Sequence, residues 1–296
     1  MTVLADTQIE ELAMRKPWYE VSTTLLRKYP LGAAGALVVV VMIFLAVFAN
    51  FLSPYDPESN DFEHMLTPPG WQYWLGTDQF GRDILTRIIF GARTALFVGF
   101  SCAIIGATVG LVFGVTSAYF GGRFDLIFQR IMDIFMAFPL IIMALAVVSI
   151  FGTGTQNVII AITIPFIPRC ARVVRSSALA IREIPYVDAA RALGFTHARI
   201  ILRHMTPNVM APYLIMLTAF VGQAILLEAS LSYLGLGVQE PTPAWGLMLQ
   251  GGAEEYAESA PWVAVYPGIA ISLAVFGFNL FGDSLRDALD PKLRSQ

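Results

Sequence analysis

Long stretches without a single charged residue are the feature that most restricts what this chain can fold into. Residues 29–55, 94–122, 134–168, 205–227 and 259–282 contain no Asp, Glu, Lys or Arg. A helix needs about 20 apolar residues to cross a bilayer. Charged residues make up only 14% of the chain, against about a quarter in a typical soluble domain. The windows therefore indicate an integral membrane protein.

The window 134–168 is too long for a single crossing, because a helix rises about 1.5 Å per residue. Glycine, threonine and amide residues cluster at 152–157, which is typical of a turn. We therefore divide the window into helices at about 131–150 and 158–178, the first of them kinked at Pro139. The sequence thus predicts an all-α integral membrane protein with six transmembrane helices.

Lysine and arginine are shared unevenly between the two sides of the membrane that these spans define. With both termini in the cytoplasm, the cytoplasmic pieces contain 16 of the 19 basic residues, as the positive-inside rule requires. The chain is predicted to be a multi-pass protein of the plasma (inner) membrane. Its expected parts are a cytoplasmic tail (1–30), a first transmembrane helix (31–52), an extracytoplasmic segment with an elbow helix (53–92), a five-helix core that includes a cytoplasmic loop at 181–212 (93–283), and a cytoplasmic tail (284–296).

Several classes of function are disfavoured by composition. Lys16, Lys28 and Lys292 are the only lysines, and none stands in a P-loop, so the chain is not expected to bind ATP itself. A net charge of −3 does not favour nucleic acid. The predicted spans bring together no nucleophile, base and orienting group, and the three histidines are poorly spaced for a metal. We therefore expect no enzyme activity, no bound cofactor and no metal site.

Two groups of residues inside the predicted spans are candidates for packing and for transport. Gly106, Gly110 and Gly114 recur every four residues, so they share a helix face that a second helix can approach closely. Glu228 is an acid placed well inside a predicted span, and ionisable groups at such depth usually face a cavity or another polar group. We predict that Glu228 and Ser232, one turn further on, line the pathway or a gate. A structural hydrogen bond from the opposite helix end is the open alternative.

The loop at 181–212 is the most informative part of the chain. Pro185 suits the first turn of a helix, and residues 188–193 are mostly good helix formers. Gly194 permits a sharp turn, and Thr196 can cap a second short helix. The pattern predicts two short helices that meet at a glycine, in the most cationic loop of the protein.

This loop resembles the EAA loop of ABC importer permeases, in which a coupling helix docks in a cleft of the cytoplasmic ATPase. The resemblance is carried by Asp188-Ala189-Ala190 and by Gly194 after three further residues. It implies that these four residues and Leu193 form the ATPase-coupling surface. The chain has Asp where the family pattern begins with Glu, so the partner of the acid stays open. A connector with a solvated charged face is the alternative.

Motifs elsewhere extend the resemblance to nearly the whole chain, from about residue 31 to residue 294. The stretches concerned are 53–57 (SPYDP), 75–83 (LGTDQFGRD), 228–237 (EASLSYLGLG) and 279–291 (NLFGDSLRDALDP). These motifs are similar to those of the second permease subunit of dipeptide, oligopeptide and nickel importers.

The resemblance implies a type I ABC importer permease fold with a cytoplasmic coupling helix. The implied function is to form half of the translocation pathway of an ATP-driven, binding-protein-dependent importer, with dipeptides or short oligopeptides as the first expected cargo. The implied partners are a homologous permease subunit in a heterodimer, two ATPase subunits that use ATP and Mg, an extracytoplasmic substrate-binding protein, and membrane lipid. Nickel, glutathione or another small solute are alternative cargoes. An ion-coupled carrier or channel is the alternative class, although Glu228 has no evident cation partner in the spans.

The extracytoplasmic segment is expected to contain a short elbow helix before the second span. Thr77 or Asp78 is a suitable cap, and Asp78 and Arg82 are spaced as an i, i+4 pair. An ion pair on a surface stabilises little. We therefore favour a structural cap with a surface ion pair, with a role in receiving the binding protein as the alternative.

Overall fold

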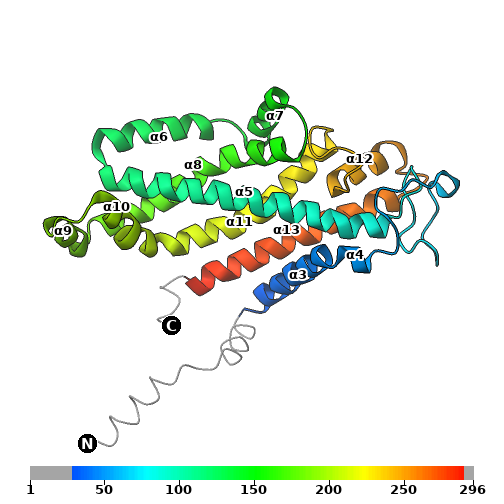
Figure 1. Ribbon diagram of the computed structural model, residues 1–296, viewed down its shortest axis with the longest axis horizontal. Helices are drawn as coiled ribbons and strands as arrows, with labels where there is room; N and C mark the ends of the chain where they lie inside the picture. Colours follow the sequence, from blue (N-terminus) through cyan, green and yellow to red (C-terminus); the bar gives the residue numbers. More distant parts are fainter. Residues whose placement is uncertain (1–28, 290–296) are drawn as a thin grey trace, which may run out of the picture.

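The computed structural model describes residues 29–289, in which long helices lie side by side in an elongated bundle (Figure 1). The predictions for most of the N-terminal tail and for 290–296 lie outside the described residues. Between the described ends, the helices have the following bounds: α3 Pro30–Val47, α4 Ala49–Leu52, α5 Ile84–Phe120, α6 Gly122–Met136, α7 Leu140–Phe151, α8 Thr155–Arg182, α9 Pro185–Ala192, α10 His197–Arg199, α11 Met210–Tyr233, α12 Trp245–Glu255 and α13 Trp262–Leu289.

Five helices of the described region are long and apolar enough to cross a membrane, and α6 with α7 makes a sixth if the bent pair is one span. The five are α3, α5, α8, α13 and the segment His197–Tyr233, in which irregular turns lead into α11. The helical fold expected from the uncharged windows is therefore present.

The third span differs from the prediction of one kinked helix at 131–150. Helices α6 and α7 are bent by 87° relative to each other, with Pro139 at the break. Proline lacks a backbone N–H and disfavours helical geometry in the residue before it, so the helix stops here rather than bending gently. Helix α6 also begins earlier than expected, at Gly122, because its two acidic residues pair with arginines of α8. Asp125, for example, accepts a 2.6 Å hydrogen bond from Nε of Arg175.

Helices α5 and α8 form the most extensively packed pair in the described chain. Gly106, Gly110 and Gly114 all face α8. A Cβ added at Gly110 would lie 2.6 Å from Cβ of Cys170, and one added at Gly114 would lie 2.6 Å from the carbonyl oxygen of Ala171. Only residues without a side chain permit this backbone approach, and inside a bilayer such close packing replaces the hydrophobic effect.

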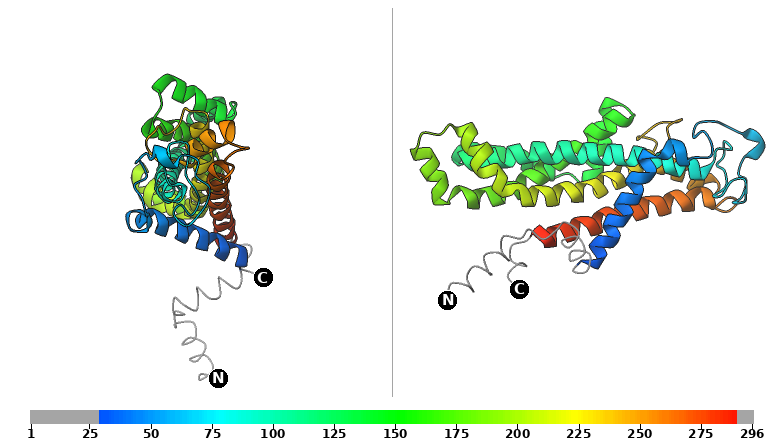
Figure 2. Two further views of the ribbon diagram at one scale, coloured as in Figure 1. Left: turned by 90° about the vertical axis from the view of Figure 1, so that its right-hand side faces the viewer. Right: turned by 60° about the horizontal axis from the view of Figure 1, so that its bottom comes forward.

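The remaining helices complete the bundle around α5. Helix α11 packs against α5 and α13, and α3 crosses α13 obliquely, as the second view of Figure 2 shows. Helix α12 was not predicted. It follows the glycine- and proline-rich turn after α11 and is held by the buried Trp245, whose Nε1 donates to the carbonyl oxygen of Ile88. Helices α9 and α10 lie at one end of the bundle, and residues 53–83 lie at the other (Figure 1).

Candidate functional site

The loop after α8 forms two short helices that meet at a glycine, as the sequence predicts. Helix α9 starts at Pro185, and Thr196 caps α10 by accepting from the backbone N–H of Arg199. Between them, Gly194 has φ +75°, a conformation that side chains rarely adopt. We call residues 185–199 the knuckle. It is the end of the bundle farthest from the segment at 53–83 (Figure 1).

The knuckle has one face turned to the bundle and one turned away. Val187 and Ala190 are buried, whereas Asp188, Ala189 and Leu193 are exposed. Leu193 is the extreme case, because 73% of this apolar residue is accessible. The predicted coupling residues are therefore brought together, and all except Ala190 lie on the outside of the chain, where a partner can contact them.

At the opposite end of the bundle, the structure corrects the prediction of an elbow helix and a surface ion pair. No helix precedes Ile84 at residues 75–83, and Asp83, not Thr77 or Asp78, caps α5. Asp78 is only 4% exposed and accepts from the backbone N–H groups of Phe80 and Arg82, so it closes a turn. Its other oxygen accepts a 2.7 Å hydrogen bond from Nε of Arg82.

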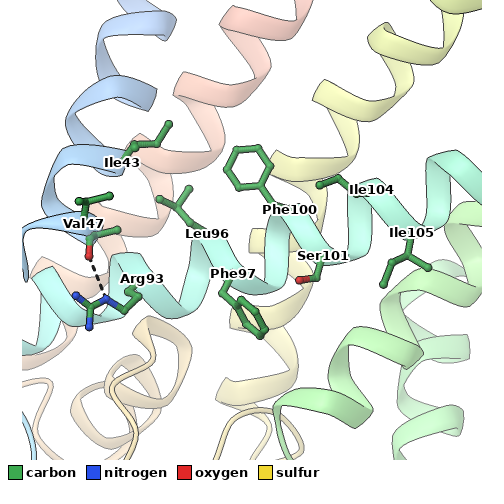
Figure 3. A pocket seen from close by; sticks show the side chains of 10 residues that line it. Ile43, Val47, Arg93, Leu96, Phe97, Phe100, Ser101, Ile104 and Ile105 are labelled. Atoms are coloured by element: carbon green, nitrogen blue, oxygen red, sulfur yellow. Dashed lines mark hydrogen bonds between the residues drawn. The ribbon is translucent and has the colours of Figure 1, made fainter.

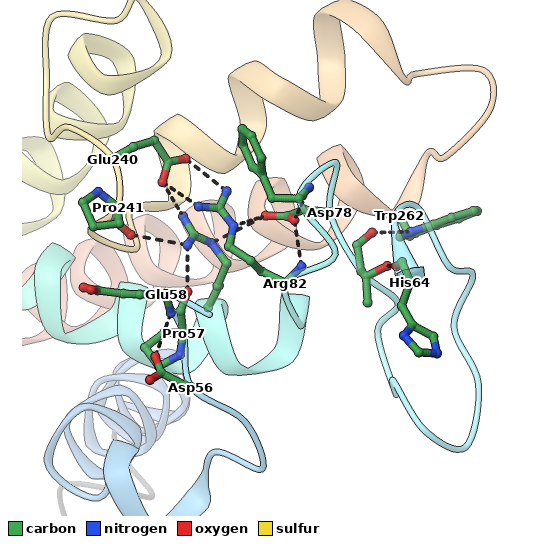
Figure 4. Close-up of polar contacts among 12 residues, drawn as sticks. Asp56, Pro57, Glu58, His64, Asp78, Arg82, Glu240, Pro241 and Trp262 are labelled. Atoms are coloured by element: carbon green, nitrogen blue, oxygen red, sulfur yellow. Dashed lines mark hydrogen bonds and ion pairs between the residues drawn. The ribbon is translucent and has the colours of Figure 1, made fainter. Parts of the chain in front are cut away.

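Asp78 and Arg82 belong to a larger ionic cluster with Arg87 and Glu240. Figure 4 shows Arg82 of this cluster between Asp78 and Glu240. The Arg82 guanidinium binds both carboxylate oxygens of Glu240, at 2.7 and 3.1 Å. Arg87 is fully buried in the first turn of α5 and donates to the carbonyl oxygen of Pro57 at 2.9 Å. Two cations and two anions thus fasten the segment after α4 and the loop after α11 to the start of α5.

Two groups of this cluster that lie outside the membrane-spanning helices, Arg82 and Glu240, have pKa values shifted in the direction that favours their ion pair. Burial alone raises the pKa of Glu240, but the hydrogen bonds and charges of Arg82 and Arg87 outweigh it and leave the pKa below its ordinary value. Burial likewise lowers the pKa of Arg82, and its bonds to Glu240 and the charge of Asp78 outweigh that effect and raise it. Both groups are therefore ionised at neutral pH.

Acidification is expected to loosen the loop around Glu240. A carboxyl with a lowered folded-state pKa stabilises the fold above its unfolded pKa, and this contribution is lost as the pH falls through the folded value. The loss should therefore begin below the ordinary glutamate pKa of about 4.3. Hydrogen exchange of residues 235–244 tests this between pH 7 and pH 3.5. In the Glu240→Gln variant, residues 235–244 should be less protected from exchange at pH 7, and their protection should not fall further because of Glu240 protonation at low pH. An identical pH profile of protection in both proteins would contradict this role of Glu240.

Glu228 lies in α11 with 1% of its surface exposed. Its Oε1 accepts a 2.7 Å hydrogen bond from the hydroxyl of Ser232, and that hydroxyl accepts from the backbone N–H of Val238. The two predicted pathway residues are therefore close together, and their hydrogen bonds connect the end of α11 to the turn that follows it. The hydrogen bond observed for Glu228 therefore comes from its own helix, and a role of Glu228 and Ser232 in the pathway or a gate stays a prediction.

A groove of about 700 Å³ lies between α3 and α5 (Figure 3). Its lining is apolar apart from Ser101 and Arg93, and Nε of Arg93 donates to the carbonyl oxygen of Ala46 at 3.0 Å. None of the predicted site residues lines it. The groove is suited to apolar material, not to a polar cargo.

Residues 110–295 match the family described as "Binding-protein-dependent transport system inner membrane component", and residues 17–69 match the "N-terminal TM domain of oligopeptide transport permease C". The chain belongs to this permease family. It is thus a permease subunit of an ABC importer, as the motifs predict.

Named relatives align with the permease along almost its whole length. The dipeptide transport system permease protein DppC of Alkalihalophilus pseudofirmus is 43% identical over 94% of this chain and 91% of its own. The glutathione transport system permease protein GsiD of Pectobacterium atrosepticum is 41% identical, over 97% and 95%. A chain of the MetNI methionine ABC transporter, solved in inward-facing conformations, has a TM-score of 0.56 and 21% identity over 70% of this chain and 98% of that chain. This last likeness shows a shared fold.

Arg87 and Glu240 of the permease are parts of the polar site that were not predicted from the sequence. An available signal was an arginine one turn inside an apolar helix, because such a cation needs a partner. A second signal was the acid at the end of the glycine-rich turn. Their separation of 153 residues leaves the pairing itself to the structure.

Proposed function

We propose that the permease forms half of the translocation pathway of an importer for dipeptides or short oligopeptides, and that the knuckle docks on an ATPase subunit. The observation that carries the proposal is the knuckle itself: a short helix at the end of the bundle, with an exposed leucine and exposed small residues. Such a surface suits insertion into a cleft of another protein, because an exposed apolar side chain gains free energy when a partner covers it.

The proposed arrangement places the knuckle and both termini in the cytoplasm. Arginines accumulate at the knuckle end of α8 and in the loop that follows, which is the distribution that favours the cytoplasmic side. At the other end, Arg82 and Arg87 are held inside the ionic cluster, so they add little positive charge to that surface. The proposed partners are a homologous permease subunit, two ATPase subunits and an extracytoplasmic binding protein.

The proposed cargo rests on what the relatives are named for. One transports dipeptides and the other glutathione, which is itself a short peptide. We propose that ATP and Mg are used by the partner ATPase subunits and that this chain has no catalytic role of its own. The cargo classes are separated by measuring how strongly the extracytoplasmic binding protein binds a labelled dipeptide, and how well unlabelled glutathione or a nickel chelate competes with it.

Leu193→Asp is expected to weaken ATPase binding by roughly 30-fold, because covering one leucine contributes about 2 kcal/mol. The measurement is the amount of ATPase subunit that copurifies with the permease from membranes expressing the whole transporter. Leu234→Asp is the matched control, since Leu234 is also exposed but follows α11 at the opposite end. Equal ATPase recovery with Leu193→Asp and the parent would contradict the proposed docking surface.

A further inference from the structure

Tyr119 stands in the last turn of α5 and contacts the knuckle through its hydroxyl. The residue is 4% exposed, and its hydroxyl lies 2.7 Å from Nδ1 of His197, the first residue of α10. The two rings also meet edge to face, with centroids 5.5 Å apart. One side chain of α5 therefore holds α10 by a hydrogen bond and by ring packing.

The same ring holds α9. The guanidinium carbon of Arg191 lies 5.0 Å from the centroid of the Tyr119 ring, within the range of a cation–π contact. Nη1 of Arg191 in turn donates a 3.0 Å hydrogen bond to Oδ1 of Asp188, the acid of the EAA-like motif. The exposed carboxylate of Asp188 is thus oriented by an arginine whose own position depends on Tyr119.

Tyr119 is itself firmly placed because neighbouring residues tie the end of α5 to other helices. Nη1 of Arg182, at the end of α8, donates to the carbonyl oxygen of Ala118 at 3.0 Å. Ser117 donates to Asp125 of α6, which is paired with Arg175. A side chain in this turn therefore moves with the α5–α8 pair, not with the knuckle.

We infer that Tyr119 is a positioning residue that fixes the knuckle to the end of α5, setting the direction of Asp188 and passing displacement of α9 to the bundle. The inference rests on the proposed docking of α9 on an ATPase subunit. In this view, Tyr119 is the residue through which a displacement of the knuckle reaches α5, and α5 extends to the ionic cluster at the other end of the bundle.

The contact is tested first on the isolated fold, by hydrogen exchange of residues 185–205 in the intact chain in nanodiscs. Tyr119→Leu removes both the hydroxyl and the ring, and exchange should accelerate about tenfold or more. Tyr119→Phe keeps the ring under Arg191, so its effect should be smaller. Tyr213→Phe is the matched control, because its hydroxyl also contacts α5, at Thr108, but away from the knuckle. Unchanged exchange in Tyr119→Leu overturns the inference, whether or not the proposed function is correct.

The transmission is tested in the complete transporter, reconstituted with its ATPase subunits and binding protein and supplied with a labelled dipeptide. Tyr119→Leu should retain its ATPase subunits while the number of ATP molecules hydrolysed per peptide imported rises at least fivefold. A purely structural role would lower uptake and hydrolysis together and leave that ratio unchanged, which would overturn the inference. Absence of dipeptide uptake or of bound ATPase in the parent transporter would instead refute the proposed function.

Discussion

Gly110→Ala is expected to destabilise the permease by about 2 kcal/mol, and Gly110→Leu to prevent folding, because overpacking strains a filled interface. The new Cβ would lie 2.6 Å from Cβ of Cys170 and 2.8 Å from the carbonyl oxygen of Ile167. A backbone carbonyl cannot turn aside as a side chain can, so α8 would have to move away from α5. This movement would reduce the packing contacts between α5 and α8, the most extensively packed helix pair of the described chain.

Gly268→Ala in α13 is the matched control, since the nearest atom to its new Cβ is 4.0 Å away. Both substitutions gain the same intrinsic helix propensity, about 1 kcal/mol in favour of alanine. The difference between them therefore isolates the contact with α8. The measurement is the temperature at which each variant in nanodiscs loses its monodisperse elution peak. Equal temperatures for the two alanine variants would show that α5 and α8 approach less closely than the structure indicates.

The packing of Gly106, Gly110 and Gly114 shows how much of this fold could be predicted from the sequence. Uncharged windows predict where spans lie, and a four-residue repeat of glycines predicts which face of a helix is approached closely. Neither predicts helix length. The uncharged window that contains these glycines begins at Thr94, yet α5 starts ten residues earlier, at Ile84. The extension is possible because Arg87 and Arg93 donate to backbone carbonyl groups of other segments.

Long-range pairing also explains the errors at the two ends of the bundle. The sequence predicts a local pair of Asp78 and Arg82 on the surface, whereas contact with Glu240 buries them in a turn. The sequence also predicts a helix only from about residue 131, whereas α6 begins at Gly122, because the charge of Asp125 is paired with Arg175 of α8. Charge counts describe a chain in isolation, and partners distant in sequence decide whether a charge ends a helix.

The candidate coupling site was more accessible to sequence analysis because its structure is local. A proline, a helix-forming stretch, a glycine and a capping threonine follow one another within twelve residues, so each sets the conformation of its neighbours. Burial within the loop and the contact with Tyr119 were not predictable in this way, since they depend on where α5 ends.

Gly194→Val is expected to reduce uptake to background while leaving insertion in the membrane intact. A non-glycine residue at positive φ costs about 1–2 kcal/mol, and more when it is β-branched. Gly194 has φ +75° and no atom within 4 Å of a new Cβ, so the change acts only through the backbone. Relief of the strain turns α9 relative to α10, and only the small population that keeps the original angle can dock as proposed.

Two variants separate this effect from general damage. Gly235→Val has the same backbone strain, with φ +74° and no neighbouring atom, but lies beyond α11 at the other end of the bundle, so ATPase binding should persist. Gly194→Asn should retain much of the uptake, because asparagine tolerates this conformation. The measurements are dipeptide uptake into vesicles, the amount of permease in the membrane fraction, and the amount of ATPase subunit that copurifies with the permease. Normal uptake by Gly194→Val would mean that the angle between α9 and α10 does not govern docking, and the coupling role of the knuckle would then have no structural basis.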